Sequence, residues 1–167
     1  MQTSNKVLIT GGCGFIGTSL IASLLRDRPD CHIRVFDSLV TGSEEDLAEV
    51  AAFTRMSPEE AGAAKSGVVL VVADIRDAEA LQACARGVDS IVHLAANTGV
   101  GPSVEDPRLD MACNVIGTFN ALEAARGNGV RSFVFASSCG PAGEVEQRPP
   151  RDGRPPVHIR VGISLLR

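Results

Sequence analysis

The apolar residues of this sequence gather into five short runs, and the segments between the runs repeat their apolar residues every three or four positions. The runs are residues 7–9, 32–37, 67–74, 89–96 and 130–138. Short runs of Val, Ile, Leu and Phe are typical of strands that are buried on both faces of a sheet. Because strands and helices alternate along the chain, we predict an α/β fold in which helices cover both faces of a doubly wound parallel sheet.

Three of the intervening segments have the pattern of helices. In the first, the apolar positions are Ile16, Leu20, Ile21, Leu24 and Leu25, which form the face of a helix laid on a sheet. In the long segment after Pro107, which ends at the turn 127–129, one apolar stripe is formed by Met111, Val115, Phe119 and Leu122. Residues 43–66 carry two helix start signals, at Ser43 and Ser57, and predict two short helices or one broken helix.

The turn between the first strand and the first helix contains three glycines at three-residue intervals, Gly11, Gly14 and Gly17. This spacing, after a strand and before a helix, is typical of a turn that holds the pyrophosphate of a dinucleotide. Gly11 would allow the sharp turn, Gly14 would let the backbone approach the phosphates, and Gly17 would let helix and strand pack closely. The helix N-terminus, with Phe15 and Ile16, would face the phosphates. A structural turn in another α/β domain is the alternative.

The second strand ends in an acid. Asp37 lies twenty residues after Gly17, where its carboxylate can accept both hydroxyls of an adenosine ribose, with Ser38 beside it. An ionised Asp37 favours NAD over NADP, because it would repel a 2′-phosphate and no arginine follows in residues 38–42. An acid that caps a helix or a loop is the alternative. These motifs predict a Rossmann sheet of strand order 3-2-1-4-5 that binds its ligand at the carboxyl ends of the strands.

The third and fourth strands also end in residues that suit a bound cofactor. Asp74 could accept from the amino group of adenine while Ile75 packs on the ring, although Asp74 or Asp77 could instead cap the next helix. Small residues at the end of the fourth strand, within Leu94-Ala95-Ala96, would leave room for the cofactor. His93 is a candidate catalytic base, but a histidine inside an apolar strand is more often a satisfied core residue, and we favour that role.

Composition and charge narrow the classes of function. The chain has 167 residues, enough for one domain, and 44% of them are apolar. A net charge of −4 with scattered basic residues does not indicate a nucleic acid or an anionic membrane as partner. No apolar run is long enough to span a membrane and no signal-peptide core is present, so we expect a cytoplasmic protein. The five cysteines contain no C-x-x-C pair and are expected to be reduced, and we predict no metal site.

Taken together, these segments resemble the extended short-chain dehydrogenase/reductases, and among them the NAD-dependent nucleotide-sugar epimerases and dehydratases. The resemblance covers residues 6–143 and is carried by residues 10–17, by Asp37 with Leu39 and Thr41-Gly42, and by residues 74–77, 93–96, 114–118 and 133–138. It implies NAD as cofactor and a nucleotide sugar as substrate. It also implies that Ser138 hydrogen-bonds a sugar hydroxyl and that Asn114 belongs to the cofactor site, where it steadies the sheet and the active-site water.

One element of the family pattern has no counterpart in the sequence. The resemblance implies a Tyr-x-x-x-Lys pair about 25 residues after Ser138, whose Tyr removes a hydroxyl proton while NAD takes the hydride. The sequence contains no tyrosine, and Ile163 and Arg167 stand near the two expected positions. Neither side chain can exchange that proton, so we expect this chain by itself to be catalytically impaired or inactive.

Composition changes at residue 148. Residues 148–167 hold five Arg and four Pro with almost no apolar pattern, so we predict a disordered tail after a dinucleotide-binding domain at residues 1–147. A shifted reading frame or a truncation remnant would explain this tail, and a basic segment for an anionic partner is the alternative.

The sequence therefore predicts the NAD-binding part of a nucleotide-sugar epimerase or dehydratase, truncated before its catalytic pair. A non-catalytic nucleotide-binding or sensor module is the alternative. The resemblance implies dimerisation through a helix that matches the segment after Pro107 and through a later helix that the sequence lacks, so we do not expect self-association.

Overall fold

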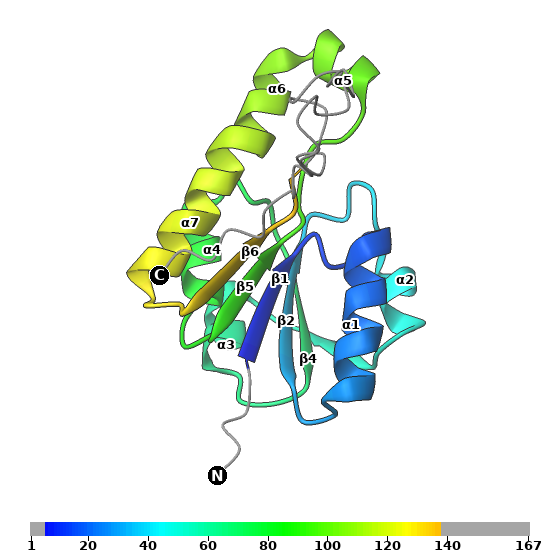
Figure 1. Ribbon diagram of the computed structural model, residues 1–167, viewed down its shortest axis with the longest axis vertical. Coiled ribbons are helices and arrows are strands. Elements are labelled where there is room, and N and C mark those ends of the chain that lie inside the picture. Colours follow the sequence, from blue (N-terminus) through cyan, green and yellow to red (C-terminus); the bar gives the residue numbers. More distant parts are fainter. Residues whose placement is uncertain (1–5, 138–167) are drawn as a thin grey trace, which may run out of the picture.

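The computed structural model describes residues 6–137, which form a six-stranded parallel sheet with helices on both faces (Figure 1). The strands are β1 (Lys6–Thr10), β2 (His32–Asp37), β3 (Phe53–Arg55), β4 (Val68–Val72), β5 (Ser90–His93) and β6 (Ser132–Phe135). Their order is β3-β4-β2-β1-β5-β6, and every neighbouring pair is parallel. The five predicted strands are β1, β2, β4, β5 and β6, so the predicted doubly wound order is confirmed.

The helices divide between the two faces of the sheet. They are α1 (Phe15–Asp27), α2 (Glu44–Ala48), α3 (Pro58–Ala63), α4 (Ala78–Cys84), α5 (Val100–Glu105), α6 (Pro107–Met111), the π-helix η1 (Ala112–Gly117) and α7 (Thr118–Gly127). Helices α1 and α2 cover one face, and α3, α4 and α7 cover the other (Figure 1). Among residues 6–137, no helix has both the length and the apolar character needed to cross a membrane.

Successive residues of each strand point into two different cores, because side chains alternate across a strand. In β1, Val7 and Ile9 pack on the face covered by α1, whereas Leu8 packs on the face covered by α4 and α7. Both faces are therefore apolar, which explains why the strands appear in the sequence as continuous apolar runs.

The segment between β2 and β4 contains two short helices and a strand that the sequence did not predict. Ser43 and Ser57 cap α2 and α3, and each makes a capping box with the acid three residues later, as their start signals indicated. The unpredicted strand is β3, which pairs with β4 at the edge of the sheet. Two of its three residues are exposed, so no apolar run marks it.

The predicted long helix after Pro107 is divided into α6, η1 and α7. Most of its expected inward stripe faces outward: Met111, Val115 and Phe119 are 52%, 58% and 59% exposed. The fourth residue of the stripe, Leu122, is partly buried and packs against the core, as expected. The buried residues of η1 and α7 are small, namely Gly117, Ala121, Ala124 and Ala125. A Cβ on Gly117 would lie 2.5 Å from Ile75 Cδ1, so the backbone approaches the core too closely for large side chains to face inward.

A buried arginine connects the sheet to the ends of two helices. Arg34, in β2, is 1% exposed. Its Nη1 donates to the carbonyls of Cys84 and Arg86, both at 2.7 Å, and its Nη2 donates to the carbonyls of Gly62 and Ala64, both at 3.3 Å. These carbonyls lie at the C-terminal ends of α3 and α4, where helical partners are missing and the helix dipole is negative. One guanidinium therefore donates to four carbonyls at the ends of two helices.

The topology creates a crevice beside β1, which pairs with β2 on one side and β5 on the other. The chain leaves β1 toward β2 and later returns to β5, so the connections that follow these strands run in opposite directions. In doubly wound sheets, ligands bind outside the carboxyl ends of the strands at this point of reversal.

Candidate functional site

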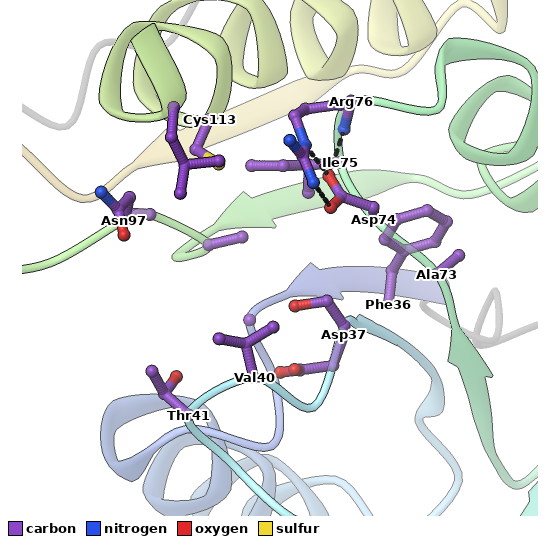
Figure 2. Close-up of a pocket in the computed structure, with 15 residues that line it drawn as sticks. Phe36, Asp37, Val40, Thr41, Ala73, Asp74, Ile75, Arg76, Asn97 and Cys113 are labelled. Atoms are coloured by element: carbon purple, nitrogen blue, oxygen red, sulfur yellow. Dashed lines mark hydrogen bonds and ion pairs between the residues drawn. The ribbon is translucent and has the colours of Figure 1, made fainter. Parts of the chain in front are cut away.

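A cavity of about 200 Å³ opens at the crevice. Its lining residues are Gly11, Phe36, Asp37, Ser38, Val40, Thr41, Ala73, Asp74, Ile75, Arg76, Ala95, Ala96, Asn97, Leu109 and Cys113 (Figure 2). Seven of the predicted site residues are among them: Gly11, Asp37, Ser38, Asp74, Ile75, Ala95 and Ala96. Residues that follow four different strands therefore meet at one cavity, as the sequence predicted.

The first and third glycines of the turn after β1 are required by the packing of the protein itself. Gly11 has a φ of +69°, and a Cβ there would lie 2.7 Å from the backbone nitrogen of Ala95. A Cβ on Gly17 would lie 2.5 Å from the Gly11 carbonyl oxygen and from the Gly12 Cα. These two glycines allow the turn to touch the end of β5 and allow α1 to start directly on β1.

The packing of the protein does not explain why the second of the three positions is a glycine. Gly14 has ordinary extended backbone angles, φ −76° and ψ 171°, and a Cβ there would contact only the Gly11 carbonyl oxygen, at 3.4 Å. Gly14 is also the N-cap of α1, and neither a capping side chain nor an acid in the first turn occupies the free N–H groups of this helix. The N-terminus of α1 is therefore available to an anion.

The side chains of Phe15 and Ile16 point away from the core, with exposed fractions of 90% and 62%. We predicted that Ile16 lies on the face of α1 that packs against the sheet, and this was wrong. Ile21 provides that contact, with Leu20, Leu24 and Leu25 partly buried beside it. At the first turn of α1 the sheet-facing position belongs to Gly17, so the side chain of Ile16 is left in solvent.

Asp37 connects the end of β2 to the glycine turn. Its Oδ2 accepts from the backbone N–H of Cys13 and its Oδ1 from that of Leu39, both at 2.9 Å. A carboxylate has about four acceptor positions, so both oxygens can still accept a hydroxyl from the cavity. Burial, with the nearby Asp37 carboxylate, raises the pKa of Cys13 to about 12, so this thiol is a packed loop residue rather than a reactive one.

Asp74 lies across the cavity from Asp37 (Figure 2). The guanidinium of Arg76 donates to both oxygens of Asp74, from Nε at 2.9 Å and from Nη2 at 2.5 Å. This hydrogen-bonded pair holds the pKa of Asp74 below its usual value. Asp77 is the N-cap of α4 and accepts from the Ala80 N–H at 3.0 Å, so the capping alternative is confirmed for Asp77. Asp74 and Ile75 remain in the cavity wall.

His93 is a satisfied core residue, as favoured from the sequence. It is 1% exposed, its Nδ1 lies 2.7 Å from Thr10 Oγ1, and its Nε2 lies 3.1 Å from Thr118 Oγ1. The Thr118 hydroxyl donates to the Asn114 carbonyl at 2.7 Å, so it accepts from His93. The hydrogen-bond network therefore assigns a neutral imidazole with its proton on Nε2, and Thr10 donates to Nδ1.

Burial lowers the pKa of His93 from 6.5 to about 4. The unfolded chain therefore binds a proton between these pH values more readily than the folded one, and the stability that neutral His93 contributes is lost as pH falls from 6.5 toward 4. We expect His93 to lower the free energy of unfolding, measured with urea, by about 2 kcal/mol between pH 7 and pH 5, at about 1.4 kcal/mol per pH unit below 6.5. Burial also lowers the pKa of His32, which adds to this loss. His93→Gln should lose much of this pH dependence, and an unchanged pH dependence in that variant would show that His93 is not its source.

The remaining predicted residues lie around the cavity or beyond the described part of the chain. Gly14, Phe15, Ile16, Gly17, Leu94 and Asn114 are not in its lining. Asn114 lies behind one wall, where its side chain holds Asn97 through hydrogen bonds of 2.8 Å and 3.0 Å. Ser138 and the boundary at residue 147 lie outside residues 6–137.

Several lining residues were not predicted as site residues. Val40 follows Asp37 in the same loop, so its closeness in sequence was an available signal. Thr41 and Arg76 belong to the motifs that carry the family resemblance, but they were not named as site residues. Leu109 and Cys113 come from α6 and η1. No sequence pattern indicates that this helical segment reaches the end of β5, because its position depends on the tertiary packing of α7.

Comparison with known proteins identifies similar sequences. The sequence model of the NAD dependent epimerase/dehydratase family matches residues 7–160. A dTDP-glucose 4,6-dehydratase of Mycobacterium tuberculosis (strain H37Rv) is 38% identical over 127 residues, which are 75% of this chain and 34% of that protein. A UDP-glucose 4-epimerase of Streptomyces lividans is 36% identical over 149 residues, which are 87% of this chain and 40% of that protein.

Solved structures show the same similarity. The UDP-glucose 4-epimerase of Thermus thermophilus in complex with NAD has a TM-score of 0.64 and 36% identity, and covers 80% of this chain and 37% of that one. The dTDP-glucose 4,6-dehydratase DesIV of Streptomyces venezuelae, with NAD and DAU bound, has a TM-score of 0.69 and 34% identity, and covers 85% of this chain and 42% of that one. The chain thus spans between a third and a little over two fifths of the length of these relatives.

Proposed function

Because this chain belongs to the NAD-dependent epimerase/dehydratase family, we propose that residues 6–137 bind NAD in the cavity at the carboxyl edge of the sheet. The pyrophosphate lies at the N-terminus of α1, and the adenosine occupies the cavity between Asp37 and Ile75. When bound, NAD supplies a hydride acceptor. The residues of this chain contribute binding and orientation.

The pyrophosphate and the adenosine of the dinucleotide each have a matching group in the site. The N–H groups at the start of α1 receive the phosphates, because they carry the positive end of the helix dipole and have no capping side chain. Asp37 receives the adenosine ribose hydroxyls with the acceptor positions that Cys13 and Leu39 leave free. Adenine packs beside Ile75 and meets Asp74 at the edge of the cavity.

The observation that supports this proposal best is the environment of Gly14. Its backbone angles are open to any residue, and no protein atom lies closer than 3.4 Å to a Cβ placed there. A ligand that lies against this part of the backbone explains why a side chain is absent. Isothermal titration calorimetry with NAD and with NADP tests the proposal. We expect NAD to bind and NADP to bind much more weakly, because a 2′-phosphate would meet the ionised Asp37; the absence of NAD binding would refute the proposal.

Asp37→Ala should weaken NAD binding by about tenfold to a hundredfold, since hydrogen bonds to a charged group are lost. The substitution also removes the acceptor for the N–H groups of Cys13 and Leu39. Asp37→Asn, which keeps one oxygen acceptor, separates the two effects, because we expect it to bind NAD more tightly than Asp37→Ala does. Asp30→Ala changes an exposed aspartate before β2 and should leave the dissociation constant unchanged. Equal NAD binding by the parent and Asp37→Ala would contradict the role of Asp37.

For the whole protein, we propose a nucleotide sugar as substrate, supported by the names of the relatives that the chain matches. Ser138 would contact the sugar, as the family resemblance implies. The 167 residues contain no tyrosine, so the hydroxyl proton that this chemistry moves has no tyrosine acceptor within them. We therefore expect no turnover when this chain is incubated with NAD and UDP-glucose or UDP-galactose. Formation of the epimer or of NADH above background would refute this expectation.

The missing tyrosine favours a second candidate, a non-catalytic module that binds or senses NAD. The same two assays separate the possibilities. If calorimetry shows NAD binding and no turnover is found, the chain could be either the module or the NAD-binding part of an enzyme. A second chain that carries the Tyr-x-x-x-Lys pair is then added to decide between them. Restored turnover supports the enzyme, and unchanged NAD binding without turnover supports the module.

A further inference from the structure

Three polar side chains form a closed cluster at one wall of the cavity. They are Asn97, in the loop after β5, Asp110, in α6, and Asn114, in η1. Within residues 6–137, every hydrogen bond between this loop and the α6–η1 segment involves Asp110 or Asn114. The cluster therefore provides the polar connection between two segments whose bonded residues are 13 to 17 positions apart in the sequence.

Asp110 sets the orientation of both amide side chains. Its Oδ1 accepts from Asn114 Nδ2 at 3.0 Å and from Asn97 Nδ2 at 3.2 Å. A carboxylate only accepts hydrogen bonds, so it selects the NH₂ group of each amide. Asn114 Oδ1 is thereby turned toward the backbone N–H of Asn97, from which it accepts at 2.8 Å, while its Nδ2 also donates to the Asn97 carbonyl at 3.0 Å.

The residues next to this cluster line the cavity. Ala95, Ala96 and Asn97 form the wall from the loop after β5, and Leu109 and Cys113 form the wall from the helical segment. Asn97 and Cys113 lie on the same side of the cavity, facing Val40 and Thr41 (Figure 2). Leu109 directly precedes Asp110, and Cys113 directly precedes Asn114. A change in the cluster would therefore move residues that contact a ligand.

The segment formed by α6 and η1 needs a polar connection to the loop after β5 to hold its position. Helix α6 has five residues, and the π-helix η1 follows it directly. The Thr118 hydroxyl donates to the Asn114 carbonyl, a bond of the kind that accompanies local bending of helices. Figure 1 shows α5 and α6 extending past the carboxyl edge of the sheet. Packing on the core does not fix this end of the segment, because its large apolar residues, such as Leu109 and Met111, are exposed.

We propose that Asp110 is a positioning residue of the dinucleotide site: through the amides of Asn97 and Asn114 it holds the loop after β5 against α6 and η1, and so fixes the width of the cavity. This inference rests on the proposed function, because NAD is the ligand whose binding the cluster controls. Asp110 itself does not contact the ligand.

Asp110→Ala and Asp110→Asn test this role by calorimetry with NAD. Asp110→Ala removes the acceptor for both amides and should weaken NAD binding about tenfold. Asp110→Asn keeps an oxygen in the same place and should bind NAD within about twofold of the parent. Glu105→Ala removes an exposed carboxylate at the end of α5 and serves as the matched control. Unchanged NAD binding in Asp110→Ala, or equal losses in both Asp110 variants, would overturn the proposal.

A measurement without ligand separates this inference from the proposed function. The backbone N–H of Asn97 should exchange with deuterium about tenfold faster in Asp110→Ala than in the parent, because Asn114 no longer holds it, and Asp110→Asn should restore the protection. If the parent does not bind NAD but this exchange pattern is found, the proposed ligand is wrong and the cluster is confirmed. If the parent binds NAD and the exchange rate is unchanged, the role of Asp110 is wrong.

Discussion

Gly14→Val should lose at least about a hundredfold in NAD affinity, or about 3 kcal/mol, while its fold stays intact. The reason is the position of the missing side chain. No protein atom lies closer than 3.4 Å to a Cβ placed on Gly14, and its φ of −76° suits valine. The added side chain would therefore stand where phosphates approach the N-terminus of α1. Calorimetry with NAD gives the affinity, and urea unfolding monitored by circular dichroism gives the stability.

Two other glycines make this test specific. Gly101, in the exposed helix α5, also has open space where a Cβ would stand, and Gly101→Val should leave NAD binding unchanged. Gly17→Ala should instead destabilise the fold, because a Cβ there would lie 2.5 Å from two backbone atoms. If Gly14→Val binds NAD as the parent does, the phosphates do not lie at this turn. If it unfolds as Gly17→Ala does, Gly14 is required by the protein and not by a ligand.

The largest expected effect on stability is that of Arg34→Met, at about 3 kcal/mol, because each buried acceptor left without a donor costs about 1–3 kcal/mol. The methionine would leave two carbonyls without this donor, that of Cys84, whose hydrogen bond is buried, and that of Arg86, whose hydrogen bond is partly buried. Because these acceptors belong to the backbone, no second substitution can remove them. Arg34→Lys keeps the charge but loses the planar set of donors that reaches two helix ends at once, so we expect an intermediate loss.

Urea unfolding at pH 7 measures both Arg34 variants. Arg28→Met removes an exposed arginine just beyond α1 and should change the free energy of unfolding by less than about 0.5 kcal/mol. Arg34→Met with the stability of the parent would mean that the four carbonyls find other donors, and that Arg34 is not needed to join α3 and α4 to the sheet.

The sequence predicted the sheet well because burial on both faces leaves a strong signal. Five strands appeared as apolar runs, and their order was confirmed. β3 left no such signal, since Thr54 and Arg55 are exposed and its strand geometry depends on pairing with β4. Local pattern cannot detect a strand that only its neighbour defines.

The face of a helix was harder to predict than its existence. Met111, Val115 and Phe119 have the correct spacing for a buried stripe, but periodicity alone does not say which face meets the core. The short distance between Gly117 and Ile75 determines which face is buried, because only small side chains fit between this part of the helix and the core. The cluster of Asn97, Asp110 and Asn114 was unpredictable for a related reason, since it depends on where the π-helix places two side chains relative to a loop.

The cavity residues were predictable to the extent that they follow strands directly. Asp37, Asp74 and Ala95 all stand at strand ends, and parallel topology brings such ends to one edge. For His93 the sequence left two roles to compare, a catalytic base and a satisfied core residue. In the structure, the hydroxyls of Thr10 and Thr118 lie within hydrogen-bond distance of its two ring nitrogens, which identifies His93 as a core residue. No pattern in the sequence connects residues so far apart.

The central position of β1 also affects how the protein is made. β1 is synthesised before the other strands of this sheet, yet one of its two edges pairs with β5, and the Lys6 N–H is bonded to Asp89, 83 residues later. Until β5 leaves the ribosome, the nascent chain carries an apolar strand with one open edge. Chaperone binding should therefore be strongest for ribosome-bound chains that end before Ser90 and should decline once β5 has emerged.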